Sequence, residues 1–393
     1  MSVELLAPAG NLSCLKLAVS YGADAVYIGI GNFSLRNDST GFSERSIIAA
    51  TRFAHRAKAK VYGAINFIPH DSDFKSLTNT IKKLERLHLD GVICASAEIL
   101  RLVKKNTKLP VFISTQQSVL NSAAIAFWKS LGADRVILGR ELSIDQIKRL
   151  CETSEVELEC FIHGGMCTNL SGRCHLSHYY TKRDANRGYC AQPCRWIYQL
   201  QEENGFSYDE IFTMGAMDLC AISLIPELLK TGVSSLKIEG RMKSEYYIAA
   251  CVHGYRSWID ANENQTASES LLKEVMDDLD SCANRPAGTG FLEAKEKPGQ
   301  IYPVTDSFVN HRFLGIVKKI DKTRFSTNLR NPLRLGEEVT VMSPKQPLRH
   351  FIVEKMTNAE GEEIVECHQP MSEVRLQAPF VIPPYSMIRR RNT

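Results

Sequence analysis

Short apolar runs with the character of β-strands alternate with amphipathic segments through the first 260 or so residues. A regular alternation of this kind predicts a (β/α)8 barrel of the TIM type. A doubly wound open sheet is the alternative, but it calls for a glycine-rich phosphate-binding turn after the first strand, where the chain reads Ala7-Pro8-Ala9-Gly10-Asn11. The expected strands are Val3–Ala7, Ala25–Gly29, Val61–Asn66, Gly91–Ala95, Val111–Thr115, Arg135–Gly139, Glu157–His163 and Ser235–Glu239.

The pattern divides the chain into a barrel domain and a smaller second domain. We expect the barrel over residues 1–262, interrupted by a Cys-rich insertion at 164–212, then a polar helix and linker at 263–303. Residues 304–393 alternate in the β period and contain turn residues, which predicts a small C-terminal all-β barrel. Its expected strands are Phe313–Val317, Glu338–Met342, Phe351–Glu354, Glu373–Leu376 and Phe380–Ile382.

Composition indicates the class of protein and the cellular compartment. Apolar residues make up 44% of the chain and the net charge is +4, which is typical of a globular protein. No apolar run approaches the ~18 residues of a membrane span, and the first residues do not resemble a secretory signal. We therefore expect a cytoplasmic protein with no membrane partner. The chain has twelve cysteines, and in that reducing compartment they indicate metal or catalytic chemistry and not disulfides.

Four of these cysteines lie within the insertion, at Cys167, Cys174, Cys190 and Cys194. Four thiolates can hold either a zinc ion or an iron–sulfur cluster. Zinc ribbons use Cys-x2-Cys pairs, and the chain has none, so the spacing favours a [4Fe-4S] cluster. Unligated thiols remain the third interpretation, because free cysteines are often simply buried.

The insertion is also basic and aromatic. Arg173, Arg183 and Arg195 are interleaved with tyrosines and with Trp196. Cations that contact phosphates and rings that stack on bases are what single-stranded nucleic acid requires. The competing interpretation is that the arginines are solvated and the rings pack around the metal centre.

Charged side chains at strand ends predict a site at the carboxyl-end face of the barrel, where such barrels place their active sites. Arg140 follows the sixth strand and His163 ends the seventh. In the eighth, Lys237, Glu239 and Arg241 point the same way if the strand period of two holds. They form either an ion-pair layer that closes the barrel or a site for an anionic substrate. In the second interpretation Glu239 and His163 transfer protons, while Lys237, Arg140 and Arg241 hold the anion.

Several common chemistries lack their sequence motifs. The chain contains no Gly-x-Ser-x-Gly, no His-Glu-x-x-His and no Gly-x4-Gly-Lys-Ser/Thr, which disfavours serine hydrolases, common zinc proteases and P-loop nucleotide hydrolysis.

Several long motifs resemble those of the collagenase-like peptidase family of unassigned catalytic type. They include His163-Gly164-Gly165-Met166-Cys167, Ser171-Gly172-Arg173-Cys174-His175, Arg187-Gly188-Tyr189-Cys190-Ala191-Gln192-Pro193-Cys194 and Leu236-Lys237-Ile238-Glu239-Gly240-Arg241. The resemblance covers residues 3 to about 260 densely and extends to the C-terminal domain. It is strongest to the branch that hydroxylates the wobble uridine of tRNA.

The resemblance implies an oxygen-independent hydroxylase. In that branch the product is 5-hydroxyuridine, prephenate is the implied hydroxyl source, and the four cysteines of the insertion hold a [4Fe-4S] cluster. The expected partners are tRNA, a small anionic co-substrate, and an electron donor or a second copy of the chain. The alternatives are a protease, as the family name says, a hydroxylase of ribosomal RNA or of a ubiquinone precursor, and a zinc-stabilised RNA-binding module.

Overall fold

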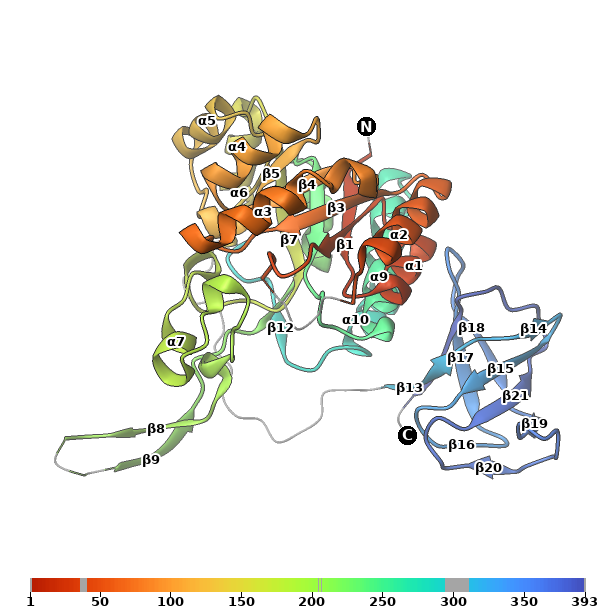
Figure 1. Ribbon diagram of the computed structural model, residues 1–393. Helices are drawn as coiled ribbons and strands as arrows, with labels where there is room; N and C mark the ends of the chain where they lie inside the picture. The colour runs from red at the N-terminus through yellow and green to blue at the C-terminus, as the bar shows by residue number, and fades with distance from the viewer. Residues whose placement is uncertain (1, 36–40, 204, 206, 294–310, 392–393) are drawn as a thin grey trace.

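A closed barrel of eight parallel strands forms the centre of the computed structural model, which describes residues 2–35, 41–203, 205, 207–293 and 311–391 (Figure 1). The strands follow the order β11-β1-β2-β3-β4-β5-β6-β7, and β7 pairs with β11 to close the ring. The (β/α)8 prediction is confirmed. The strands are β1 (Glu4–Pro8), β2 (Ala25–Gly29), β3 (Lys60–Ile65), β4 (Gly91–Cys94), β5 (Val111–Ile113), β6 (Arg135–Ile137), β7 (Glu157–Gly164) and β11 (Ser235–Ile238).

Helices cover the outside of the barrel, and local residue chemistry sets their ends. Ser143 and Gln146 form a reciprocal capping box at the start of α6. Gly22, Gly132 and Gly232, which stop three helical segments, have φ values of 111°, 98° and 83°, a left-handed conformation that glycine adopts without strain. The helices are α1 (Leu12–Tyr21), α2 (Glu44–Arg56), α3 (Phe74–Ile81), α4 (Ala97–Asn106), α5 (Ser122–Ser130), α6 (Ile144–Thr153), α8 (Ile225–Leu229) and α9 (Glu245–Glu263).

A layer of buried charges crosses the inside of the barrel. Lys237 Nζ lies 2.7 Å from Glu159 Oε1, and Arg135 Nη1 lies 3.1 Å from Glu159 Oε2. Arg135 also pairs with Glu4, whose carboxylate accepts a hydrogen bond of 2.6 Å from the hydroxyl of Tyr62. The layer therefore ties β1, β6, β7 and β11 together. One of the two interpretations of the sequence was an ion-pair layer of Lys237, Glu239 and Arg241. A layer is present, but the acid that pairs with Lys237 is Glu159 of β7.

The insertion follows β7 and carries its own short elements. These are α7 (Leu176–Thr181) and an antiparallel hairpin of β8 (Tyr198–Gln201) and β9 (Ser207–Phe212), which projects away from the barrel (Figure 1). After it, β10 (Asp218–Cys220) pairs antiparallel with the end of β7. The sequence did not predict the hairpin.

The segment expected to be a helix and linker belongs partly to the barrel. The expected polar helix is α10 (Glu269–Asp280), which packs on α9. The residues expected to start the linker instead include β12 (Ala287–Gly288), which pairs with β10 and extends the barrel sheet. The expected boundary between residues 303 and 304 lies outside the described residues.

The C-terminal domain consists of antiparallel strands around a core of its own. One four-stranded sheet has the order β13-β22-β17-β18 and the other the order β14-β15-β21-β19. The expected strand Phe380–Ile382 is wrong. The Phe380 ring packs on Phe351 and under Arg349, so its apolar character reflects packing and not a strand. Two prolines follow at 383 and 384, and proline disfavours strand pairing. The strands are β13 (His311–Ile316), β14 (Ile320–Asp321), β15 (Arg324–Asn328), β16 (Leu333–Arg334), β17 (Glu338–Met342), β18 (Arg349–Ile352), β19 (Met356–Thr357), β20 (Glu366–Cys367), β21 (Glu373–Gln377) and β22 (Met387–Arg391).

Buried polar contacts join the two domains. Arg389 of β22 is 1% exposed and pairs with Asp278 of α10. His253 of α9 lies 3.0 Å from Asp278 Oδ2 and 3.0 Å from the carbonyl oxygen of Gln346, and these contacts outweigh burial and raise its pKa. The hydroxyl of Tyr21 donates to the carbonyl of Met342 at 2.8 Å. Arg389 is therefore part of the junction between the two domains.

No helix in the described part of the chain is long and apolar enough to cross a bilayer.

The charged layer predicts very different effects for two carboxylates of β7. Glu159 is fully buried, whereas the Glu157 side chain is 55% exposed, and both pair with Arg135. We expect Glu159→Gln to lower the free energy of unfolding by about 3–5 kcal/mol, because it leaves the buried Lys237 without its anion and removes one of the carboxylates that surround Arg135. The matched Glu157→Gln should cost about 1 kcal/mol or less, because water screens the exposed pair. Urea denaturation of both variants measures the difference, and equal losses would contradict this account of the barrel.

Candidate active site

The insertion attaches to the loops at the carboxyl ends of the barrel strands. The Arg187 guanidinium pairs with Asp73 at 2.7 and 3.1 Å and donates to the carbonyl of Ile68 at 3.0 Å. In return, the amide of Ile68 donates to the carbonyl of Asn186 at 3.0 Å. These contacts place the insertion beside the loop that follows β3.

Two more contacts attach the insertion to neighbouring loops. The amide of Ser171 donates to Glu141 Oε1 at 2.7 Å, after β6. Arg173 donates to Gln117 Oε1 at 3.2 Å, after β5. The insertion therefore lies on the carboxyl-end face of the barrel, where the sequence predicted the site.

Side chains of the insertion fix the backbone around its cysteines. Asn186 accepts a hydrogen bond from the amide of Cys174 at 3.4 Å and donates to its carbonyl at 3.2 Å. The buried hydroxyl of Ser177 donates to the carbonyl before Cys190 at 3.4 Å and accepts from the amide after it at 3.0 Å. Cys194 lies in a tight turn whose first carbonyl accepts from the Tyr198 hydroxyl at 2.7 Å.

The four thiols lie near enough to influence one another, and none forms a disulfide. The pKa of the Cys194 thiol is raised, first by partial burial and then by repulsion from Cys167, Cys190 and Cys174. Within the described residues, no three His, Cys, Asp or Glu side chains are arranged to hold a single metal ion. Sulfurs that share one zinc lie about 3.8 Å apart, given Zn–S bonds of roughly 2.3 Å, whereas a cube of iron and sulfide needs a wider set. Four free thiols near one another are a donor set that an iron–sulfur cluster or a zinc ion accepts.

A group of charged side chains converges on Gly165, two residues before Cys167. The position that a Cβ atom would take on Gly165 lies 3.3 Å from Arg195 Nη2, 3.5 Å from Glu239 Oε2 and 3.7 Å from Asp218 Oδ1. Arg285 donates to Asp218 at 3.1 Å. A larger residue at 165 would fill the space on which these groups converge.

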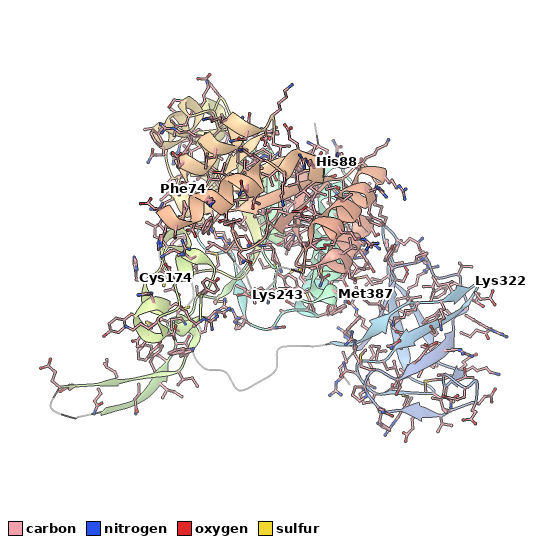
Figure 2. All side chains as sticks on the ribbon, in the orientation of Figure 1. Phe74, His88, Cys174, Lys243, Lys322 and Met387 are labelled. Atoms are coloured by element: carbon pink, nitrogen blue, oxygen red, sulfur yellow. The ribbon has the colours of Figure 1, made fainter. Side chains whose placement is uncertain are left out.

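Cations outnumber acids around this point. Lys243 Nζ lies 3.9 Å from Asp218, so Arg195, Arg285 and Lys243 surround two carboxylates. Partial burial and the neighbouring Arg285 lower the pKa of Arg195. The excess of positive charge makes this group a candidate site for an anion. Figure 2 shows Lys243 below the barrel, on the side where Cys174 lies.

Arg140 lies close to the same group. Its guanidinium packs over the ring of Phe161 at 3.8 Å and donates to the carbonyl of Gly165 at 2.7 Å. Arg140 therefore holds the backbone at the start of the insertion, next to the charged side chains that converge on Gly165.

His163 is buried behind this group. Its Nδ1 lies 3.2 Å from the Tyr255 hydroxyl, and its ring contacts those of Tyr247 and Tyr255. Burial, and then the charge of Lys243, lower the pKa of His163 to about 3. The imidazole is therefore neutral near pH 7 and cannot donate a proton as an imidazolium.

The other two predicted anion-binding side chains are used by the barrel itself. Lys237 is buried against Glu159 and the ring of Tyr27. Arg241 is buried as well, and its guanidinium donates to the hydroxyl of Ser34 at 3.1 Å and to the carbonyl of Leu35. Both cations also lie by the ring of Tyr27, at 4.5 Å for Lys237 and 5.9 Å for Arg241. Burial, and then the charge of Glu239, raise the pKa of the Tyr27 hydroxyl.

Aromatic side chains form a continuous exposed row on the insertion. The ring centroids of Tyr179 and Tyr180 are 5.2 Å apart, and Tyr180 lies 5.8 Å from Trp196 and 6.2 Å from Tyr198. Tyr179 is 75% exposed. Arg183 and Arg173 are exposed on the same segment, whereas Arg195 is half-buried near the cysteines.

Sequence reasoning missed three charged members of the site. Asp218 and Lys243 fall inside or beside motifs that carry the family resemblance, but nothing in their spacing marks them as neighbours. Arg285 lies in a segment that reads as a linker, and only the pairing of β12 with β10 brings it to Asp218.

Comparison with known proteins assigns the family. The model of peptidase family U32 matches residues 10–301, and the model of that family's C-terminal domain matches residues 309–389. The chain belongs to peptidase family U32. The resemblance found in the sequence motifs is thereby confirmed.

Three relatives indicate which members the chain is similar to. The tRNA hydroxylation protein P1 of Bacillus subtilis (strain 168) is 37% identical over 400 residues, which cover 98% of this chain and 94% of the relative. The tRNA hydroxylation protein P of Escherichia coli (strain K12) is 31% identical, over 91% of this chain and 90% of the relative. The 23S rRNA 5-hydroxycytidine C2501 synthase of Escherichia coli (strain K12) is also 31% identical, over 92% of this chain but 52% of the relative.

The contacts of Arg187 predict how firmly the insertion is held. We expect Arg187→Met to remove a bidentate, mostly buried ion pair worth about 1–2 kcal/mol and so to speed hydrogen–deuterium exchange in residues 164–201 several-fold. Lys182→Met, at an exposed position of the same segment, is the matched control and should leave exchange unchanged. If Arg187→Met exchanges as slowly as the wild type, Arg187 does not anchor the insertion.

Proposed function

We propose that the chain is an RNA hydroxylase, and that it converts the wobble uridine of tRNA to 5-hydroxyuridine. The observation that carries this proposal is the match, along nearly the whole of both chains, to a tRNA hydroxylation protein. The ribosomal RNA synthase supports the broader class of reaction, but this chain spans only 52% of that relative. The protease hypothesis has behind it the family name and the names of two relatives, a protease and a collagenase, that match about three quarters of this chain. Against it, His163 of the signature motif is buried against Tyr255. We infer no role for a ubiquinone precursor.

The cofactor that we propose is a [4Fe-4S] cluster held by Cys167, Cys174, Cys190 and Cys194. Four free thiols on one docked segment, near one another but not arranged around a single ion, support this assignment. Such a cluster supplies electron transfer or Lewis acidity. The protein's own part is to hold the insertion over the barrel, through the Arg187 side chain and the Asn186 carbonyl, and to fix the backbone of Cys174 through the Asn186 side chain.

The side chains around Gly165 suit a small anionic co-substrate, for which prephenate is our candidate. Arginine forks bind carboxylates in two-point contacts, and Arg195 and Arg285 lie where the insertion meets β10. Arg140 is positioned on the same backbone by its bond to the Gly165 carbonyl. We propose these residues for the anion in place of Lys237 and Arg241.

Glu239 is our candidate for proton transfer. Its carboxylate lies beside the converging cations, and the Tyr247 hydroxyl fixes its backbone by donating to its carbonyl at 2.9 Å. His163, with its lowered pKa, instead contributes a neutral ring behind the site. The exposed row of rings from Tyr179 to Trp196, with Arg173 and Arg183, would receive the RNA.

Nucleoside analysis tests the reaction directly. We expect deletion of the gene to remove 5-hydroxyuridine and its derivatives from total tRNA, measured by mass spectrometry in a strain without a redundant enzyme. The wild-type gene should restore them, and Glu239→Gln should lower the restored amount by roughly 100-fold, the scale of a lost general acid or base. Unchanged nucleosides after deletion would reject tRNA hydroxylation.

Metal analysis tests the cofactor separately. Protein purified without oxygen should be brown and contain about four iron and four sulfide per chain, as a [4Fe-4S] cluster requires. Cys174→Ser should lose most of both, because a hydroxyl ligates iron poorly. Cys151→Ser, near the end of α6 and beside Gly232 in the loop that precedes β11, should retain them. A colourless protein with one zinc would instead support the zinc-stabilised RNA-binding module.

A further inference from the structure

A cavity of about 620 Å³ lies between the barrel and the C-terminal domain. The barrel side is formed by α1 and the start of α9, with Ser13, Leu17 and Glu245. The other side is formed by the segment from β13 to β14, the end of β15 and the turn before β22. The volume falls within the range of roughly 300–1,000 Å³ that is typical of ligand sites. None of the residues that we place in the active site lines this cavity.

The lining combines an apolar surface with positive charge. Leu17, Ile316 and Met371 supply apolar surface, and Tyr385 adds an aromatic ring. Tyr385 has a φ of 67°, a left-handed conformation that is uncommon outside glycine and that recurs at ligand sites. The lining therefore offers a flat ring and aliphatic side chains to a planar apolar group.

Three cations and one acid line the cavity. The cations are Lys318, Lys319 and Arg330, and the acid is Glu245. Lys318 donates to Asn328 Oδ1 at 3.0 Å, a neutral partner that leaves its charge uncompensated. Arg330 is exposed, and its guanidinium pairs with no acid in the described part of the chain. Lys319 pairs with Glu373 at 3.4 Å, so Lys318 and Arg330 carry most of the positive charge that favours an anionic ligand.

The cavity faces the same side of the molecule as the cysteines. Ser13 is in the first turn of α1 and Glu245 is the first residue of α9, and these helices follow β1 and β11. Helices that follow barrel strands begin at the carboxyl-end face, which is also where the insertion attaches. In Figure 1 the insertion and the C-terminal domain lie on the two sides of this face. A long polyanion at the cysteines can therefore extend to the cavity.

We propose that this cavity binds a nucleotide of the RNA substrate other than the one that is modified. The base lies against Tyr385 and the apolar side chains, and the flanking phosphates pair with Lys318, Lys319 and Arg330. This inference rests on the proposed function, because it assigns the C-terminal domain a share in binding the same RNA. A base with its phosphate satisfies both halves of the lining, since rings stack on any base and cations neutralise the backbone.

The test is the salt dependence of tRNA binding to the full-length protein, purified without oxygen. The variant is Lys318→Gln with Lys319→Gln and Arg330→Gln. Each cation on a single strand contributes a slope of about 0.7 in the plot of log affinity against log salt. We expect the triple variant to lose about two units of slope and to bind tRNA at least about tenfold more weakly near physiological salt.

Lys355→Gln is the matched control. Lys355 is exposed on the same domain but precedes β19, at the edge of the sheet opposite to β14. It should bind tRNA as the wild type does. Ultraviolet crosslinking of wild-type protein to tRNA gives a second measurement that needs no variant, and we expect crosslinked peptides to include Tyr385.

The outcomes separate this inference from the proposed function. If the wild type binds tRNA and the triple variant binds equally well, the cavity inference is overturned and the hydroxylase proposal stands. If the wild type binds no RNA, both are overturned. Uridine monophosphate at millimolar concentration should displace tRNA only weakly. Binding of the mononucleotide in the cavity with no effect on tRNA, or binding of an acidic peptide there in place of RNA, would also overturn the inference.

Discussion

Closure of the barrel depends on the carboxylate of Glu159. It accepts from Lys237 on one side and Arg135 on the other, and through Arg135 it is linked to Glu4. A buried group of two cations and two anions gains little net stability over apolar residues, but it tolerates few alternative arrangements. Because it ties the first strand to the last, it fixes the strand ends from which Gly165 and Glu239 are presented.

The insertion has a different kind of stability. Few of its side chains are buried, among them Ser171, Ser177 and Ala185, and its contacts with the barrel are mainly polar. A segment with so little apolar core gains order from cross-links, and a centre shared by four thiols is such a cross-link. Under the proposed function, binding of the cofactor would therefore be coupled to ordering of the insertion and of its exposed row of rings.

The sequence was most informative where the determining interactions are local. Ala25–Gly29 and Glu338–Met342 were predicted with the observed bounds, because a strand's alternation and flanking turns are short-range properties. Pairings between distant residues were not predictable. Nothing in the motif around Lys237 indicates Glu159 as its partner, and nothing in the run Arg389-Arg390-Arg391 indicates that the first of these arginines pairs with Asp278. The family was recognised from motifs, whereas the cations around Gly165 required the fold.

In the sheet with the order β13-β22-β17-β18, β22 lies between β13 and β17. It is the strand of this sheet that is synthesised last. The two flanking strands therefore cannot pair through the sheet until residue 391 has left the ribosome. Removing the final strand would open the middle of the sheet and also take the guanidinium of Arg389 from the domain junction. Proteolytic removal of β22 would thus damage the folded core of the domain and its junction with the barrel together.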